Sequence, residues 1–154
     1  METATLNDIK KTQGKILGVD FGDVRTGLAI CDASRLLASG IGFITPGGFD
    51  KTLAALAAAA LENKVSAVVV GLPVNMDGSL GARAQRCEKL ARLLQDRLEI
   101  PVALFDERMT TMTASRYLNE TNTRGKKRKL VIDTLSAQII LQNCLDRLKY
   151  MEKA

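Results

Sequence analysis

Three acidic residues lie where folding can bring them together, at the ends of apolar segments or on one face of a helix. Asp20 ends a short apolar run, and Glu107 follows the apolar run 101–105. Asp133 lies in a long helical pattern, on the same face as Ala137. Carboxylate oxygens are the ligands that Mg²⁺ and Mn²⁺ prefer, and a pair of such ions about 4 Å apart can activate water against a phosphodiester. The three acids therefore predict metal-dependent phosphodiester hydrolysis.

Each acid also has a plainer structural interpretation. Asp20 can cap a turn, and Asp133 can interact favourably with the dipole at the start of its helix. Asp106 directly precedes Glu107, and adjacent residues of a strand point to opposite faces of a sheet, so both cannot be ligands of one metal. The spacing leaves the choice between Asp106 and Glu107 open.

The composition excludes several other kinds of active site. The 154 residues include no histidine, which excludes histidine general bases and histidine-bound zinc. The three cysteines, Cys31, Cys87 and Cys144, are far apart and lie among apolar residues, so they predict buried thiols rather than a disulfide framework or a zinc site. Any hydrolysis by this chain must therefore use carboxylates or metal ions.

The charge of the chain favours a polyanionic partner. The formal net charge is +5, and the segment 124–129 holds five cations in six residues. Such a run is usually a solvated loop, but here it directly precedes the helix predicted to carry Asp133, which favours contact with a phosphate backbone. The candidate nucleic-acid contacts are Arg25, Asn75, Arg124, Lys126, Lys127, Arg128 and Lys129. Asn75, together with Asp77, can equally be a turn former, and Arg25 can pair with Asp23.

The periodicity of apolar residues predicts an α/β fold built on a mixed five-stranded sheet with helices on its faces. Residues 1–14 are expected to form a loose N-terminal arm, and residues 15–150 a single domain. The predicted strands are 16–21, 26–31, 37–44, 65–72 and 101–105, and the predicted helices are 51–63, 83–97, 110–118 and 130–150. Ligands of open α/β sheets bind at the carboxyl ends of the parallel strands, where Asp20 and Glu107 fall.

The sequence contains no segment that predicts export or membrane insertion. Residues 1–15 lack the apolar core of a signal peptide, and the longest apolar stretch, 53–61, is too short to span a bilayer. Widely spaced free cysteines suit a reducing compartment. We expect a soluble protein of the cytoplasm.

Four motifs in register give the chain a resemblance to a known family. "GVDFGDVRTGLA", "GLPVNMDGSLGARA", "FDERMTT" and "KRKLVIDTLSAQIIL" resemble, in order and spacing, the motifs of the bacterial YqgF/RuvX family. The resemblance runs from about residue 16 to residue 146. It implies an RNase H-like fold with strand order 3-2-1-4-5 and the second strand antiparallel. It also places the family's metal-binding acidic triad on Asp20, Glu107 and Asp133, which favours Glu107 over Asp106.

The resemblance implies a nuclease that matures the 5′ end of pre-16S ribosomal RNA with Mg²⁺ or Mn²⁺. One alternative is a Holliday junction resolvase that uses the same triad on branched DNA. Another is a non-catalytic RNA-binding assembly factor that retains the acids by descent. A third, suggested by the likeness of "DFGDVRTG" to a phosphate loop of actin-like ATPases, requires two such domains around a cleft, and 154 residues supply one. The sequence leaves a monomer and a homodimer open.

Overall fold

The computed structural model describes residues 2–45, 47–107 and 125–152, and the side chains of 125–134 lie outside the described residues. The elements are the strands β1 (Ile16–Phe21), β2 (Thr26–Cys31), β3 (Ala38–Ile44), β4 (Ala67–Leu72) and β5 (Val102–Asp106), and the helices α1 (Leu6–Lys10), α2 (Phe49–Glu62), α3 (Ala82–Leu98) and α5 (Gly125–Glu152). The strands form one sheet in the order β3-β2-β1-β4-β5. Strand β2 is antiparallel to both of its neighbours, whereas β4 is parallel to β1 and to β5. The predicted topology is confirmed.

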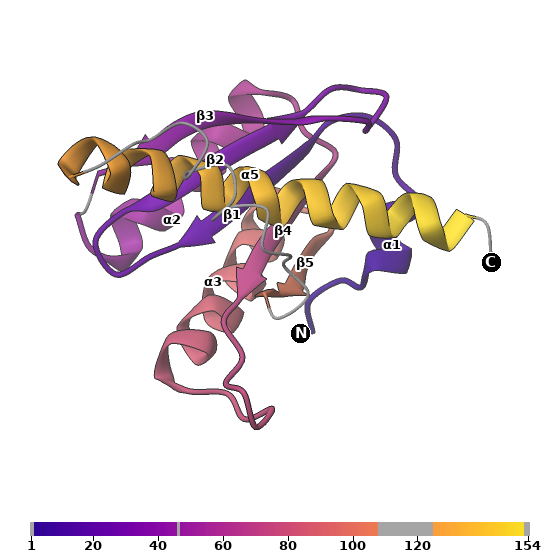
Figure 1. The fold of residues 1–154 in the computed structure, drawn as a ribbon. Helices are drawn as coiled ribbons and strands as arrows, with labels where there is room; N and C mark the ends of the chain where they lie inside the picture. The colour runs from indigo at the N-terminus through magenta and orange to yellow at the C-terminus, as the bar shows by residue number, and fades with distance from the viewer. Residues whose placement is uncertain (1, 46, 108–124, 153–154) are drawn as a thin grey trace.

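Helices cover both faces of this sheet (Figure 1). Helix α5 crosses the near face and packs against β1, β2 and β3, while α2 and α3 lie on the far face. Each face buries its own apolar core. The α5-side core includes Ile16, Val69 and Ile140, and the α2–α3-side core includes Leu17, Val70 and Leu90. Alternate residues of the central strands therefore belong to different cores, as the two-residue period of a strand requires.

The N-terminal segment is more ordered than the sequence suggests. The prediction of a loose arm over residues 1–14 is wrong for Leu6–Lys10, which form helix α1 with Thr5 as its cap. Thr5 and Asp8 form a capping box, in which each side chain accepts a hydrogen bond from the backbone N–H of the other. Ile9 is fully buried in the α5-side core. A five-residue helix is too short to show an apolar period in the sequence. The capping pair Thr5 and Asp8 was the sequence signal that could have predicted it.

Three further predictions differ from the structure or fall outside it. Helix α5 begins at Gly125, not at residue 130, because lysine and arginine are good helix formers and extend it toward its N-terminus. The apolar period of residues 51–63 also predicts Leu61 on the buried face of its helix, but Leu61 is 70% exposed at the end of α2. The predicted helix over 110–118 lies outside the described residues.

Two expectations from composition agree with the structure. Cys31, Cys87 and Cys144 are all free and buried. In the part of the chain that the structure describes, no helix has the length and apolar character needed to cross a membrane.

Candidate active site

Asp20 and Glu107 lie on the same face of the sheet, toward α5. Ile16, Gly18 and Asp20 are alternate residues of β1, so they lie on one face of the sheet. That face packs against α5, because a Cβ added to Gly18 would lie 2.7 Å from the Cβ of Leu141 in that helix. Glu107 comes directly after β5, and its Cδ would lie 3.2 Å from a Cβ added to Gly71 of β4. The same Cβ would lie 2.6 Å from Ile140 Cδ1, which identifies this as the α5 side. Because Gly71 has no side chain, it leaves room beside β4 for the side chain of Glu107.

The two carboxylates interact electrostatically. Burial and the negative charge of Asp20 raise the pKa of Glu107 to about 7, while Arg83 opposes this shift and Asp106 adds to it weakly. A neighbouring like charge and a partly desolvated position both disfavour an ionised carboxylate. Asp20 and Glu107 are thus close in space, although 87 residues separate them (107 − 20) and strand β4 lies between their strands in the sheet.

Asp106 belongs to the opposite face. Within β5 it alternates with Val102 and Leu104, which pack in the α2–α3-side core, whereas Ala103 and Phe105 belong to the α5-side core. The strand geometry therefore favours Glu107 over Asp106 as the partner of Asp20.

Asp133 lies in helix α5, but its side chain is outside the described residues. The same helix contacts the sheet one and two turns later. Ala137 O would lie 3.3 Å from a Cβ on Gly18, and Ile140 contacts Gly71. The helix thus runs across β1, which carries Asp20, and contacts β4 at Gly71, beside Glu107. The role of Asp133 as the third ligand stays a prediction.

The candidate nucleic-acid contacts are dispersed. The guanidinium of Arg25 lies 5.3 Å from the ring centroid of Phe43, as in a cation–π contact. Asn75 and Asp77 are tied into their own loop, since Asn75 donates to Ser79 Oγ and Ser79 donates to Asp77. This favours the turn-forming interpretation. Arg124 is outside the described residues, and residues 126–129 belong to the first turns of α5 with their side chains outside the described part.

Two cations near this edge were not singled out from the sequence. Arg83 lies close enough to Glu107 to lower its pKa. Arg86 forms an ion pair with Asp23 in the turn after β1, so Asp23 has a different partner from the expected Arg25. Arg83 and Arg86 are three residues apart and share a face of α3, directly after the motif "GLPVNMDGSLG". Their three-residue spacing in the sequence could have indicated that the two arginines lie on one face of a helix.

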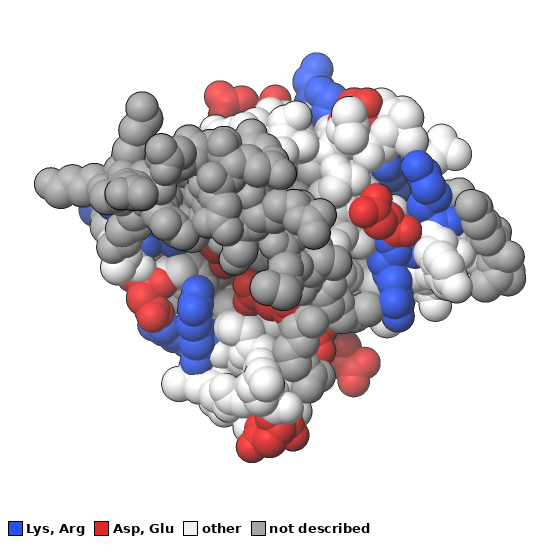
Figure 2. Space-filling view, viewed as in Figure 1, with Lys and Arg blue, Asp and Glu red and all other residues white. Residues whose placement is uncertain are grey.

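The surface in Figure 2 does not gather charge of one sign. Among the described residues, Lys and Arg side chains lie near Asp and Glu side chains and are interspersed with uncharged residues. Of the seven candidate nucleic-acid contacts, only Arg25 and Asn75 have described side chains.

A family model described as "RuvX: Holliday junction resolvase" matches residues 14–147. The chain belongs to the RuvX family. A protein of Caldanaerobacter subterraneus subsp. tengcongensis, named as a candidate pre-16S rRNA nuclease, is 43% identical over 88% of this chain and 98% of its own length. A protein of Myxococcus xanthus with the same name is 42% identical over 86% of this chain and 87% of its own length.

Solved structures agree on the fold. T. thermophilus RuvC in complex with a Holliday junction substrate superposes with a TM-score of 0.54 and 12% identity, over 90% of this chain and 96% of that one. At this identity the likeness concerns the fold alone, and it is the RNase H-like fold that the strand order indicated. The RuvX chain is therefore a nuclease, an enzyme that hydrolyses phosphodiester bonds, on an RNase H-like scaffold.

The donor set of the RuvX site suits a hard divalent cation. In the described part of the chain, no three His, Cys, Asp or Glu side chains form a group that could hold a metal ion. The described pair, Asp20 and Glu107, supplies carboxylate oxygens only, and the two charges repel one another. A bound cation would relieve that repulsion, and Mg²⁺ and Mn²⁺ favour such ligands. The residues therefore fit a divalent metal, with Asp133 as the candidate third ligand.

Proposed function

We propose that this RuvX chain is a divalent-metal-dependent endonuclease that processes the 5′ end of pre-16S ribosomal RNA in the cytoplasm. The observation that carries the proposal is the interaction between Asp20 and Glu107 on one face of the sheet. The names of the relatives from Caldanaerobacter and Myxococcus support the substrate. The free, buried cysteines suit a reducing compartment.

In this proposal Asp20, Glu107 and Asp133 hold Mg²⁺ or Mn²⁺. The metal supplies a Lewis acid for the scissile phosphate and lowers the pKa of a bound water. Asp20 and Glu107 project their carboxylates from the ends of parallel strands of a rigid sheet, which fixes the position of the reacting phosphate. Arg25 and the cations at 124–129 hold the RNA backbone, and Asn75 remains a candidate contact.

Cleavage of two labelled substrates tests the reaction. A pre-16S 5′-leader RNA and a four-way DNA junction are incubated with Mg²⁺ or Mn²⁺ and either the wild type, Asp20→Asn, or the control Asp96→Asn, which alters an exposed acid in α3. We expect the wild type and the control to cut the RNA, and Asp20→Asn to lose at least about 100-fold in rate. Cleavage of the junction alone would replace RNA processing with junction resolution. If Asp20→Asn cuts as well as the wild type, the metal-site proposal is wrong, and if nothing is cut, a non-catalytic binding role replaces it.

Metal binding has a readout that does not depend on activity. We expect Mn²⁺ to raise the Tm of the wild type at pH 8, because a ligand that binds only the folded state stabilises it. The same titration of Asp20→Asn should give a markedly smaller rise, and Asp96→Asn should behave as the wild type. Equal shifts in all three proteins would place the metal elsewhere.

A further inference from the structure

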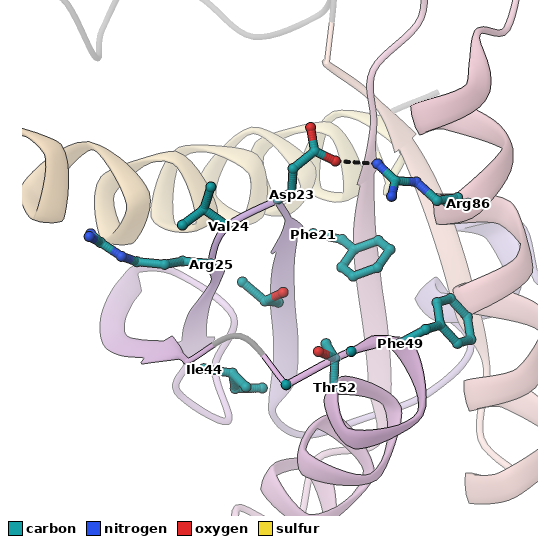
Figure 3. Close-up of a pocket in the computed structure, with 12 residues that line it drawn as sticks. Phe21, Asp23, Val24, Arg25, Ile44, Phe49, Thr52 and Arg86 are labelled. Carbon is teal, nitrogen blue, oxygen red and sulfur yellow. Dashed lines mark hydrogen bonds and ion pairs between the residues drawn. The ribbon is translucent and has the colours of Figure 1, made fainter.

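A small cavity opens on the other face of the sheet from Asp20, beside the same strand end. Its volume is about 170 Å³, and it lies between the turn that joins β1 to β2, the end of β3 and the first turn of α2 (Figure 3). Phe21, the residue after Asp20, forms part of its wall. Because adjacent residues of a strand point to opposite faces of the sheet, the cavity and the Asp20 carboxylate lie on either side of the tip of β1.

Two largely buried threonines line this cavity. Thr26 of β2 is 3% exposed and Thr52 of α2 is 6% exposed, and both belong to the cavity wall. Within the described residues neither hydroxyl has a hydrogen-bond partner, and Figure 3 shows Thr52 on the first turn of α2, directed into the space between that helix and the β1–β2 turn. Among the described residues neither hydroxyl oxygen belongs to the fully buried side-chain atoms that lack a partner, so both reach the solvent of the cavity and can donate to a ligand there.

The remaining polar groups of the cavity favour an anion. Helix α2 starts at the lining residues Gly48 and Phe49, and its N-cap Gly48 supplies no side-chain hydrogen bond to the backbone N–H groups of the first turn. Such N–H groups and the positive end of the helix dipole bind phosphate. Arg86 stands at the rim, where it is paired with Asp23, whereas the side chain of Arg25 extends away from the cavity and lies against Phe43 (Figure 3).

The size of the cavity suits one phosphate group. A water molecule occupies roughly 30 Å³ in the liquid, so about 170 Å³ accommodates a tetrahedral group of five non-hydrogen atoms. The walls are partly apolar, formed by Phe21, Ile44 and Phe49. Such walls lower the local dielectric and strengthen hydrogen bonds to an anion.

We propose that this cavity binds a backbone phosphate of the nucleic-acid strand whose scissile phosphate lies at Asp20 and Glu107. The hydroxyls of Thr26 and Thr52 and the first N–H groups of α2 donate to the phosphate oxygens. The strand passes over the tip of β1. This inference rests on the proposed nuclease function and deepens it with a second, non-reacting phosphate site.

The test uses Thr52→Val, which removes the hydroxyl and keeps the shape, with Thr45→Val as control because Thr45 is exposed just outside the cavity. Two probes are titrated, inorganic phosphate followed by amide chemical shifts, and a single-stranded RNA oligonucleotide followed by anisotropy in the Asp20→Asn background. We expect Thr52→Val to weaken binding of both probes about 10-fold, as for a lost hydrogen bond to a charged group. Thr45→Val should bind both as the parent protein does. Thr26→Val, a second variant at the opposite wall of the cavity, should weaken binding of both probes to a similar extent.

Each of the other outcomes would contradict a different part of the proposal. Weaker phosphate binding with unchanged oligonucleotide binding would make the cavity a site for a free anion and not for the strand. Unchanged binding of both probes by Thr52→Val would exclude the phosphate site. Cleavage is measured separately with the active protein. Intact RNA cleavage without any effect of Thr52→Val would contradict only the phosphate site, whereas an effect on binding in a protein that never cuts would contradict only the proposed reaction.

Discussion

The pKa of Glu107 is raised at the candidate site. Burial is the larger cause, the negative charge of Asp20 adds to it, and the positive charge of Arg83 opposes both. Without a cation Glu107 therefore keeps its proton up to a pH of about 7. Metal binding must displace that proton, so metal affinity should increase with pH through the pKa of about 7.

The raised pKa of Glu107 predicts a dependence of stability on pH. An unfolded glutamate titrates near 4.5 and the folded one near 7, so the folded state binds more protons between these values. The contribution of Glu107 to the free energy of unfolding therefore falls as pH rises from about 4.5 to about 7. We expect a loss on the order of 1 kcal/mol, discounted because the side chain is partly exposed.

Urea unfolding of the wild type and Glu107→Gln in EDTA, at pH 5 and pH 8, measures this contribution. The stability of the wild type relative to Glu107→Gln should be lower at pH 8 than at pH 5. A difference of the opposite sign would show that Glu107 is stabilised as an anion, and hence that Asp20 is not its dominant neighbour.

Glu107 and Asp106 offer a matched pair of substitutions. They are adjacent in sequence, but only Glu107 faces Asp20 across Gly71. We expect Glu107→Gln to lower the rate of RNA cleavage at least about 100-fold, and Asp106→Asn to change it less than about 10-fold. Single-turnover cleavage rates in Mg²⁺ measure both. The reverse ranking would mean that strand alternation fails at this position.

At the scale of elements, the position of α5 depends on two glycines in the central strands. Gly18 of β1 faces Leu141 and Ala137, and Gly71 of β4 faces Ile140 and Glu107. Without side chains there, the helix approaches the sheet backbone closely. Helix α5 also carries Asp133, so the depth at which it packs sets the distance of that residue from the other two acids.

Alanine at either glycine should push α5 away from the sheet. The added Cβ would lie 2.7 Å from Leu141 Cβ at Gly18 and 2.6 Å from Ile140 Cδ1 at Gly71. We expect each variant to lose about 1–3 kcal/mol in the free energy of unfolding, as overpacked cores do. Only Gly71→Ala also crowds Glu107, so it should lose more cleavage activity than Gly18→Ala at similar stability. Equal losses of activity would mean that the displaced helix, and not Glu107, limits the reaction.

The sequence predicted the elements that carry a strong period and missed those that do not. The β-branched run of β4 and the alternation in β1 and β2 are long enough to indicate strands, and the motifs fixed their order. Strand alternation separated Asp106 from Glu107 without choosing between them. The family resemblance favoured Glu107, and the packing of Glu107 against Gly71 agrees with it. The phosphate-sized cavity was not predictable, because Thr26 and Thr52 come from elements that meet only after folding.

At the scale of the molecule, the N-terminal segment is held by contacts to distant parts of the chain. The backbone N–H of Ala4 donates to the carbonyl of Val102, and Ala4 forms a parallel bridge to Ala103 of the edge strand β5. Arg35 also forms hydrogen bonds to this N-terminal segment. Its guanidinium donates to the carbonyls of Gly14 and Ile9 and to the hydroxyl of Thr12, at 2.7, 3.2 and 2.7 Å.

Replacing Arg35 should loosen this whole segment. Arg35→Met removes three charge-assisted hydrogen bonds and keeps most of the apolar stem, and we expect it to cost about 3 kcal/mol in the free energy of unfolding. Arg97→Met, at an exposed position of α3, is the control and should change stability by less than about 0.5 kcal/mol. Urea unfolding and hydrogen exchange of the Ile9 amide measure the effect. A loss below 1 kcal/mol would show that the burial of Ile9 alone holds α1 in place.

The bridge between Ala4 and β5 also has a consequence for the protein as it is synthesised. The ribosome makes Val102 98 residues after its partner Ala4 (102 − 4), a delay of about 5–20 s at ordinary rates of translation. Helix α5, which covers β1, β2 and β3, is made later still. Until α5 is synthesised, the face of the sheet that it covers therefore lacks its packing partner.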